Sequence, residues 1–259
     1  MSQSARWSDL APRLLSGLAM AVLGAVAVWA GGWVFKALVV ALAGLMTWEA
    51  ARMIGAKGAV GLGALSAAAM ALALMLPGLI VLPVLAAAAL VGAGRAGREG
   101  ALYAVFVVWV LLGCYAMGVL RDEAGLGWIA WLVLVVVVSD VAGYFAGRIL
   151  GGPKFWPRFS PKKTWSGTLA GWAGAGIVGL IFAEPLGAGA GLVVVSMLVG
   201  FAGQMGDIAE SAVKRRTGVK DSSTLIPGHG GVLDRFDAML GAAIMVTLLW
   251  MVGLMPGLT

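Results

Sequence analysis

Charged residues are scarce in this chain of 259 residues, since only 12% are Asp, Glu, Lys or Arg. A typical soluble domain carries about 25% charged and about 45–50% apolar residues, whereas 61% of this chain is hydrophobic. A water-soluble fold of this length cannot bury so large an apolar fraction. The composition therefore excludes a soluble enzyme and a disordered chain, and it indicates an integral membrane protein.

Cysteine and histidine occur once each, as Cys114 and His229. One cysteine allows no intrachain disulfide, which excludes a disulfide scaffold. We interpret Cys114, which lies inside an apolar run, as a small buried hydrophobic side chain. A lone histidine makes no metal site, so His229 is left with two interpretations, a structural hydrogen bond or a contact to a phosphate or leaving group.

The apolar runs are long and continuous, which predicts an all-α polytopic membrane protein and argues against a β-barrel of short alternating strands. The first run exceeds the apolar core of about 7–15 residues typical of a signal peptide, so we interpret it as a retained helix. About nine transmembrane runs are expected, at 11–31, 33–54, 58–76, 78–94, 100–120, 127–148, 167–184, 187–206 and 236–255.

Basic residues gather in alternate connections. Of the 18 Lys and Arg, all but Lys36 and Arg121 lie in the N-terminal tail, with Arg6 and Arg13, or after the second, fourth, sixth and eighth runs. Such a bias marks cytoplasmic loops. It predicts a cytoplasmic N-terminus, and it explains the net charge of +6 without a nucleic-acid partner.

The same bias suggests a functional division of the chain. We expect N-terminal transmembrane helices over 1–120, with packing roles and possible dimer contacts. A catalytic transmembrane region is expected over 121–259, with two large cytoplasmic loops at 149–166 and 207–235. Long polar connections on a compact membrane protein are where function is expected.

Five of the twelve acidic residues fall in one segment, as Asp207, Glu210, Asp221, Asp234 and Asp237. The spacing from Asp207 through Ser211 to Lys214 predicts one face of a helix that continues the eighth run. Asp234 and Asp237 are three positions apart at the start of the ninth run. Carboxylates at two helix ends on the cytoplasmic boundary are expected to meet, and grouped hard oxygen ligands suit Mg²⁺.

A glycine loop, Pro227-Gly-His-Gly-Gly231, lies between these acids. Glycines let the backbone approach a ligand closely, and such a loop before a helix N-terminus favours anions. The cations that would contact phosphate oxygens are Lys214, Arg215, Lys220 and Arg235. Carboxylates, cations and a glycine loop together indicate phosphoryl or nucleotidyl transfer, while a solvated loop of ion pairs remains the alternative.

A second polar segment surrounds the end of the sixth run. Asp140 lies within that run, and an intramembrane acid is a functional candidate by default. Tyr144 and Arg148 follow at helical spacing, and Ser160-Pro-Lys-Lys-Thr-Trp165 precedes the seventh run. The alternatives are an interhelical ion pair for Asp140 and a plain positive-inside anchor for Lys162 and Lys163.

Residues 211–237 resemble the signature of the phosphatidate cytidylyltransferase family, also called CDP-diacylglycerol synthases. The matching positions are Ser211, Lys214, Arg215, Lys220, Asp221, His229, Gly230, Gly231, Asp234, Arg235 and Asp237. The resemblance extends over roughly 130–255. Ser166 departs from it, because an acidic residue is common there in the family.

The resemblance implies that CTP and phosphatidic acid react to give CDP-diacylglycerol and pyrophosphate, with Mg²⁺ required. It also implies an enzyme of the bacterial inner membrane that works at the bilayer with its active site toward the cytoplasm, and a homodimer. A CTP-dependent lipid kinase is the nearest alternative function. A membrane transporter with a cytoplasmic loop is an alternative of a different class, although no internal repeat of the kind common in transporters is evident.

Catalytic roles are expected for Asp207, Lys214, Asp221, His229, Asp234, Arg235 and Asp237, and the metal ligands are expected among Asp207, Asp221, Asp234 and Asp237. Substrate binding is expected for Asp140, Tyr144, Arg148, Ser160, Lys162, Lys163, Thr164, Ser211, Arg215, Lys220, Pro227, Gly228, Gly230 and Gly231.

Overall fold

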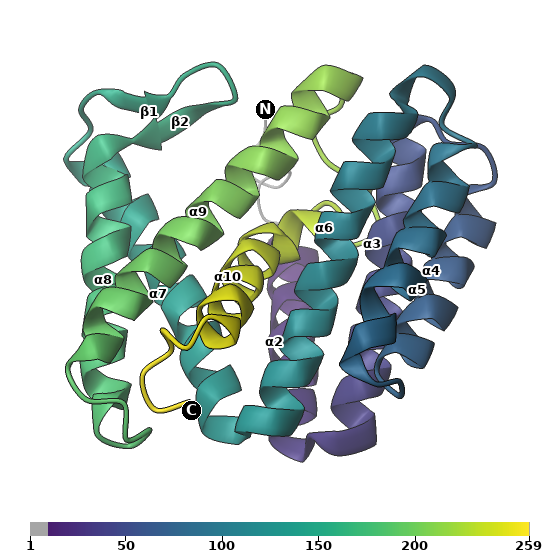
Figure 1. The fold of residues 1–259 in the computed structure, drawn as a ribbon. Coiled ribbons are helices and arrows are strands. Elements are labelled where there is room, and N and C mark those ends of the chain that lie inside the picture. Colours follow the sequence, from purple (N-terminus) through teal and green to yellow (C-terminus); the bar gives the residue numbers. More distant parts are fainter. Residues whose placement is uncertain (1–9, 259) are drawn as a thin grey trace. The chain divides into compact units, whose positions relative to one another are not determined.

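The computed structural model describes residues 10–258, so Arg6 of the basic N-terminal tail lies outside the described residues (Figure 1). Each predicted apolar run coincides with a helix. In chain order these are α2 (Leu10–Ala30), α3 (Gly32–Ile54), α4 (Ala59–Ala73), α5 (Gly78–Ala93), α6 (Gly100–Val119), α7 (Leu126–Ile149), α8 (Trp165–Ala183), α9 (Gly191–Thr217) and α10 (Leu233–Met251). A short 3₁₀ turn, η1 (Gly97–Glu99), precedes α6, and a π-helical turn, η2 (Leu120–Ala124), follows it.

Within the described residues, six segments are long and apolar enough to cross a membrane. They contain α2, α3, α6, α7, α8 and α9. Helices α4 and α5 have only 15 and 16 residues. At 1.5 Å per residue they span about 22 and 24 Å, which is less than the ~30 Å of a bilayer's hydrocarbon core. The helical membrane class is therefore confirmed, whereas the count of nine spans and the cytoplasmic N-terminus stay predictions.

The chain forms two compact units. The first contains the described residues up to Leu111 together with Thr217–Phe236, and the second contains Leu112–Arg216 together with the residues from Asp237 onward. The glycine loop therefore belongs to the same unit as helices α2 to α5. Both α6 and α10 begin in the first unit and continue into the second.

Small residues allow close helix packing in the first unit, as expected for helices in lipid. Helix α3 packs along α4, and α4 packs against α5. A Cβ built on Gly63 of α4 would lie 2.8 Å from the carbonyl oxygen of Gly44 on α3. Glycine at these positions thus brings the two backbones together.

The second unit is built on the same principle. Helices α7 and α8 pack along each other, and α9 packs on α10 so closely that a Cβ on Gly206 would collide with the backbone of Asp237. One buried polar contact joins two of these helices, since Trp131 Nε1 donates to Ser196 Oγ over 2.9 Å. Because Gly206 packs against the backbone of Asp237, the neighbouring Asp207 lies beside the start of α10.

The expectation of an all-α chain misses a small β-hairpin between α7 and α8. Strands β1 (Lys154–Trp156) and β2 (Ser160–Thr164) pair antiparallel. Aromatic side chains pack there, with the ring centroids of Phe155 and Trp165 4.7 Å apart. Aromatic residues favour strands. Much of the predicted loop 149–166 therefore forms a hairpin and not an irregular connection. The predicted loop 207–235 is shorter than expected, because α9 continues to Thr217 and α10 begins at Leu233.

Candidate active site

The segment 218–232 connects α9 to α10 and is called the glycine turn below. Its tightest part is closed by backbone hydrogen bonds. Ile226 N donates to Gly230 O over 2.8 Å, and His229 N donates to Ile226 O over 2.9 Å. Gly228 and Gly230 have φ values of 74° and 85°, a region in which only glycine is unstrained. The glycines predicted to shape an anion loop therefore do shape a turn here.

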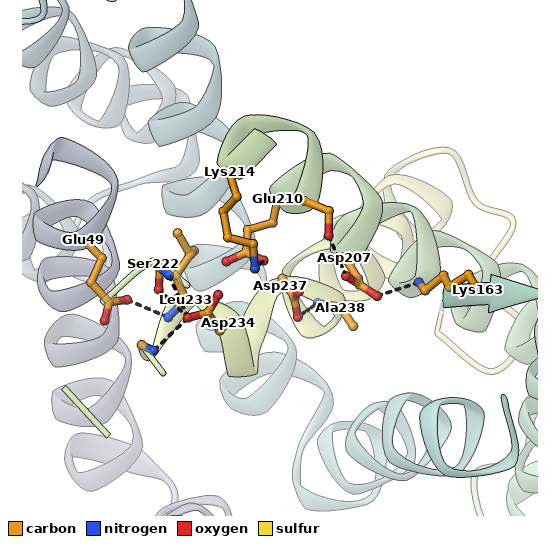
Figure 2. A network of polar contacts seen from close by, with 12 residues as sticks. Glu49, Lys163, Asp207, Glu210, Lys214, Ser222, Leu233, Asp234, Asp237 and Ala238 are labelled. Carbon is orange, nitrogen blue, oxygen red and sulfur yellow. Dashed lines mark hydrogen bonds and ion pairs between the residues drawn. The ribbon is translucent and has the colours of Figure 1, made fainter. Parts of the chain in front are cut away.

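Asp234 closes this turn from the first turn of α10 (Figure 2). Its Oδ2 atom accepts hydrogen bonds from Ser222 N at 2.9 Å, from Ser222 Oγ at 2.9 Å and from Gly231 N at 2.8 Å. Asp221 is close by, since a Cβ on Gly230 would lie 2.8 Å from Asp234 Oδ2 and 3.5 Å from Asp221 Cβ. Two of the predicted metal ligands thus flank one glycine in the first unit.

A residue that the sequence interpretation missed, Glu49 of α3, binds the same turn (Figure 2). Its carboxylate is fully buried and accepts hydrogen bonds from Ser223 Oγ at 2.6 Å, Val232 N at 2.9 Å and Leu233 N at 2.7 Å. A signal for it exists, because Glu49 is the one acid within the predicted run 33–54. The rule that singled out Asp140 as an intramembrane acid applies to Glu49 equally.

Helix α2 also contacts the turn. Ser16 Oγ lies 2.9 Å from His229 Nδ1 and donates to Pro227 O over 3.0 Å. Gly228 faces Arg13, because a Cβ there would collide with the arginine side chain. His229 therefore makes a structural hydrogen bond, the first of its two interpretations, and its role toward a substrate stays a prediction.

In the second unit, Asp207 is the centre of a polar cluster on α9. Lys163 of β2 forms an ion pair with Asp207 Oδ2 at 2.7 Å and donates to Gln204 O over 3.1 Å. Ser211 Oγ donates to Asp207 Oδ1 over 3.3 Å. The hairpin thus brings one of the two predicted lysines directly onto a predicted metal ligand, while Lys162 is exposed.

The helix face predicted from Asp207 to Lys214 is confirmed, and it carries a second ion pair. Glu210 is fully buried and pairs with Lys214 at 2.5 Å. Lys214, predicted to contact phosphates, is thus already engaged by a carboxylate. Asp237 is 8% exposed, its Oδ1 accepts from Ala238 N over 2.7 Å, and Asp207 lies near enough to interact with it electrostatically.

The predicted stripe on α7 is present but points outward. Arg148 Nη1 donates to Tyr144 OH over 2.6 Å, and Asp140 is exposed on the same helix. The neighbouring Ser139 is buried instead and accepts from Gln204 Nε2 over 3.4 Å. The structure therefore separates Asp140 from Ser139, which faces α9.

Two residues near the start of α8 have local roles. Thr164 Oγ1 accepts from Gly167 N over 3.2 Å, which caps the helix. Ser166 bonds to Thr164 Oγ1 at 3.0 Å and donates to Gly151 O. Ser166, the position that departs from the resemblance, thus fastens the hairpin to α8.

The remaining predicted residues lie mainly at the surface. Those that are exposed are Arg215, Lys220, Asp221, Pro227, Gly228 and Arg235, and Ser160 is half-buried. No group of three or more His, Cys, Asp or Glu side chains arranged to hold a metal ion is found among residues 10–258. Acidic residues instead approach one another in two places: Asp221 and Asp234 both lie beside Gly230 in the first unit, and Asp207 and Glu210 both lie near Asp237 in the second.

A model of the cytidylyltransferase family matches residues 11–252, which is nearly the whole chain. The chain belongs to the cytidylyltransferase family. The family match includes all the acids and glycines of the turn and all the polar residues of the hairpin.

Curated relatives of this chain are named phosphatidate cytidylyltransferase. The protein of Brucella suis biovar 1 is 48% identical over 137 residues, covering 51% of each chain. That of Helicobacter pylori (strain ATCC 700392 / 26695) is 39% identical over 144 residues, covering 51% of this chain and 50% of the relative. That of Bacillus subtilis is 39% identical over 126 residues, 46% and 45% of the two chains. Each match thus spans about half the length of the relative.

Proposed function

We propose that this chain transfers the cytidylyl group of CTP to phosphatidic acid, giving CDP-diacylglycerol and pyrophosphate. The observation that carries the proposal is the ordered turn between α9 and α10, in which Asp234 joins Ser222 to Gly231 and stands beside Asp221. Curated relatives with the corresponding name support the choice of substrates.

In the proposed reaction an oxygen of the lipid phosphate forms a bond to the α-phosphorus of CTP, while the bond from that phosphorus to the α–β bridging oxygen breaks. Pyrophosphate leaves with that electron pair. A phosphate monoester has a second pKa of about 6, so the lipid is largely dianionic at pH 7 and needs no general base. The obstacle is repulsion between anions, which the chain's exposed cations reduce, namely Arg215, Lys220 and Arg235.

Mg²⁺ fits the residues present, because it binds through one or two carboxylates together with substrate phosphates. The carboxylates that would hold it are expected among Asp207, Asp221, Asp234 and Asp237. When bound, it supplies charge neutralisation at the phosphates. We further propose that the enzyme works in the bacterial inner membrane with this site toward the cytoplasm; a homodimer stays a prediction.

A product analysis tests the function. Purified protein in lipid nanodiscs is incubated with CTP labelled at the α-phosphate and with phosphatidic acid, with Mg²⁺ or with excess EDTA. We expect labelled CDP-diacylglycerol and an equal amount of pyrophosphate, in the Mg²⁺ sample alone. Release of CDP with phosphorylation of a neutral lipid would indicate the lipid kinase instead, and solute flux without turnover would indicate a transporter.

The two neighbouring lysines of β2 are expected to respond differently to replacement. Lys163→Met removes the ion pair to Asp207, and a hydrogen bond to a charged group contributes about 1.5–3 kcal/mol. We expect kcat to fall roughly tenfold to a hundredfold. Lys162→Met removes an exposed cation of the same size and is expected to raise KM with little change in kcat. Steady-state kinetics of both variants measures kcat and KM. Equal changes in kcat for Lys163→Met and Lys162→Met would contradict a specific role for Lys163.

A further inference from the structure

Glu49 is a carboxylate buried in a helix that is apolar enough to span a membrane. It lies in α3, whose residues 32–54 form one of the candidate spans, and it has no exposed surface. Burying a carboxylate is costly unless hydrogen-bond donors surround it. The donors that satisfy Glu49 therefore indicate what this residue is for.

All three donors come from the two ends of the glycine turn (Figure 2). Ser223 Oγ and Val232 N donate to Glu49 Oε1, over 2.6 and 2.9 Å, and Leu233 N donates to Oε2 over 2.7 Å. Leu233 is the first residue of α10, and helix N-termini present backbone N–H groups and a positive dipole end to anions. The buried carboxylate thus holds the start of α10 and the start of the turn together.

Two of the residues bound to Glu49 are next in the chain to Ser222 and Asp234, which are hydrogen-bonded to each other. Ser223 follows Ser222, and Leu233 precedes Asp234, and Ser222 and Asp234 are joined by two hydrogen bonds of 2.9 Å. Gly231 is packed between the two systems, because a Cβ there would collide with both Ser222 Oγ and Glu49 Oε1. A displacement at Glu49 is therefore passed directly to Asp234.

We propose that Glu49 is a positioning residue, which holds both ends of the turn so that Asp221 and Asp234 stay beside Gly230. The proposal rests on the proposed function, since these acids matter only if the turn takes part in turnover. It assigns to α3, in the N-terminal part of the chain, a task in the reaction besides helix packing.

The test is Glu49→Gln, which keeps the size of the side chain. One carboxylate oxygen becomes an NH₂ group that faces a backbone N–H, so at least one bond is lost. We expect kcat for CTP-dependent turnover to fall at least tenfold, with less than a threefold change in KM for CTP. Hydrogen–deuterium exchange of the peptide covering 222–233 is expected to accelerate, while exchange in α7 and α8 stays unchanged.

Thr47→Val is the matched control on the same helix. Thr47 is fully buried, and its hydroxyl has no hydrogen-bond partner among the described residues, so an isosteric valine should leave kcat and loop exchange as in the unmodified protein. Ser223→Ala is the second variant, which remains informative if Glu49→Gln does not fold. It removes one of the three bonds and should lower kcat twofold to fivefold.

The outcomes separate the two proposals. If the unmodified protein is active and the folded variants keep its kcat and its exchange in 222–233, the positioning role is refuted. If Glu49→Gln lowers the melting temperature but the folded fraction keeps full kcat, the role is structural alone, which also refutes it. If the unmodified protein makes no CDP-diacylglycerol, the proposed function fails, and the exchange data still decide whether Glu49 holds the turn.

Discussion

Asp237→Asn is expected to lower CTP-dependent formation of CDP-diacylglycerol by about 10²–10³-fold, because Asp237 is an expected ligand of the Mg²⁺ that would neutralise the phosphates; the loss is comparable to that on removal of one oxyanion-hole donor. Asp237 is nearly buried where α9 and α10 touch at Gly206, and Asp207 is its acidic neighbour there. Asparagine keeps the oxygen that accepts from Ala238 N. The variant therefore changes charge and leaves the local hydrogen bond in place.

The measurement is the initial rate of purified variants at saturating CTP, with folding checked by size-exclusion chromatography and thermal melting. Glu184→Gln is the matched control, because Glu184 is an exposed acid at the end of α8, in the same unit. It should keep full activity. A near-normal rate for Asp237→Asn would remove Asp237 from the metal hypothesis.

Asp234→Asn is expected to be as inactive, with an additional effect on the turn. Asp234 Oδ2 accepts three hydrogen bonds from Ser222 and Gly231. The amide oxygen of asparagine can take the place of Oδ2, but it is a neutral acceptor, and hydrogen bonds to an ionised acceptor are roughly twice as strong. Faster hydrogen exchange in 222–233 is therefore expected for Asp234→Asn but not for Asp237→Asn, and this difference separates loop closure from charge neutralisation.

The helices could be predicted well because continuous apolar runs mark them directly. The run 33–54 became α3 (Gly32–Ile54), and 127–148 became α7 (Leu126–Ile149). The hairpin was not predicted because hydropathy gives no signal for its strands, which are polar or mixed. The aromatic contacts of Phe155 that stabilise it involve residues brought together only by the fold. The number of membrane spans was not settled, since helices of 15 and 16 residues satisfy the apolar pattern without reaching the required length.

The site could be predicted where its contacts are local. The bond from Ser211 to Asp207 and the pair of Glu210 with Lys214 connect residues four positions apart on α9, and helical spacing alone predicts such neighbours. The contacts of Glu49 with Ser223 and of Ser16 with His229 bridge more than 170 positions. No periodicity encodes such a pairing, so the contribution of α2 and α3 to the turn had to come from the structure.

Gly231→Ala tests whether the geometry of the turn matters, without altering any charge. A Cβ at this position would collide with Ser222 Oγ and with Glu49 Oε1. Overpacking of this kind costs about 1–3 kcal/mol. Because Ser222 and Glu49 belong to the hydrogen bonds that hold Asp234 and Leu233, we expect the turn to shift and turnover to fall at least tenfold. The readouts are kcat and hydrogen exchange in 222–233.

Gly231 is the informative glycine here because it is not among the glycines with positive φ. Alanine at Gly228 or Gly230 would combine backbone strain with crowding, whereas at Gly231 it adds a methyl group and nothing else. Gly61→Ala is the control, since a Cβ on this α4 residue meets nothing within 4 Å and alanine favours a helix. Gly61→Ala should keep full turnover. If Gly231→Ala does so as well, the arrangement of the turn around Asp234 is not what limits the reaction.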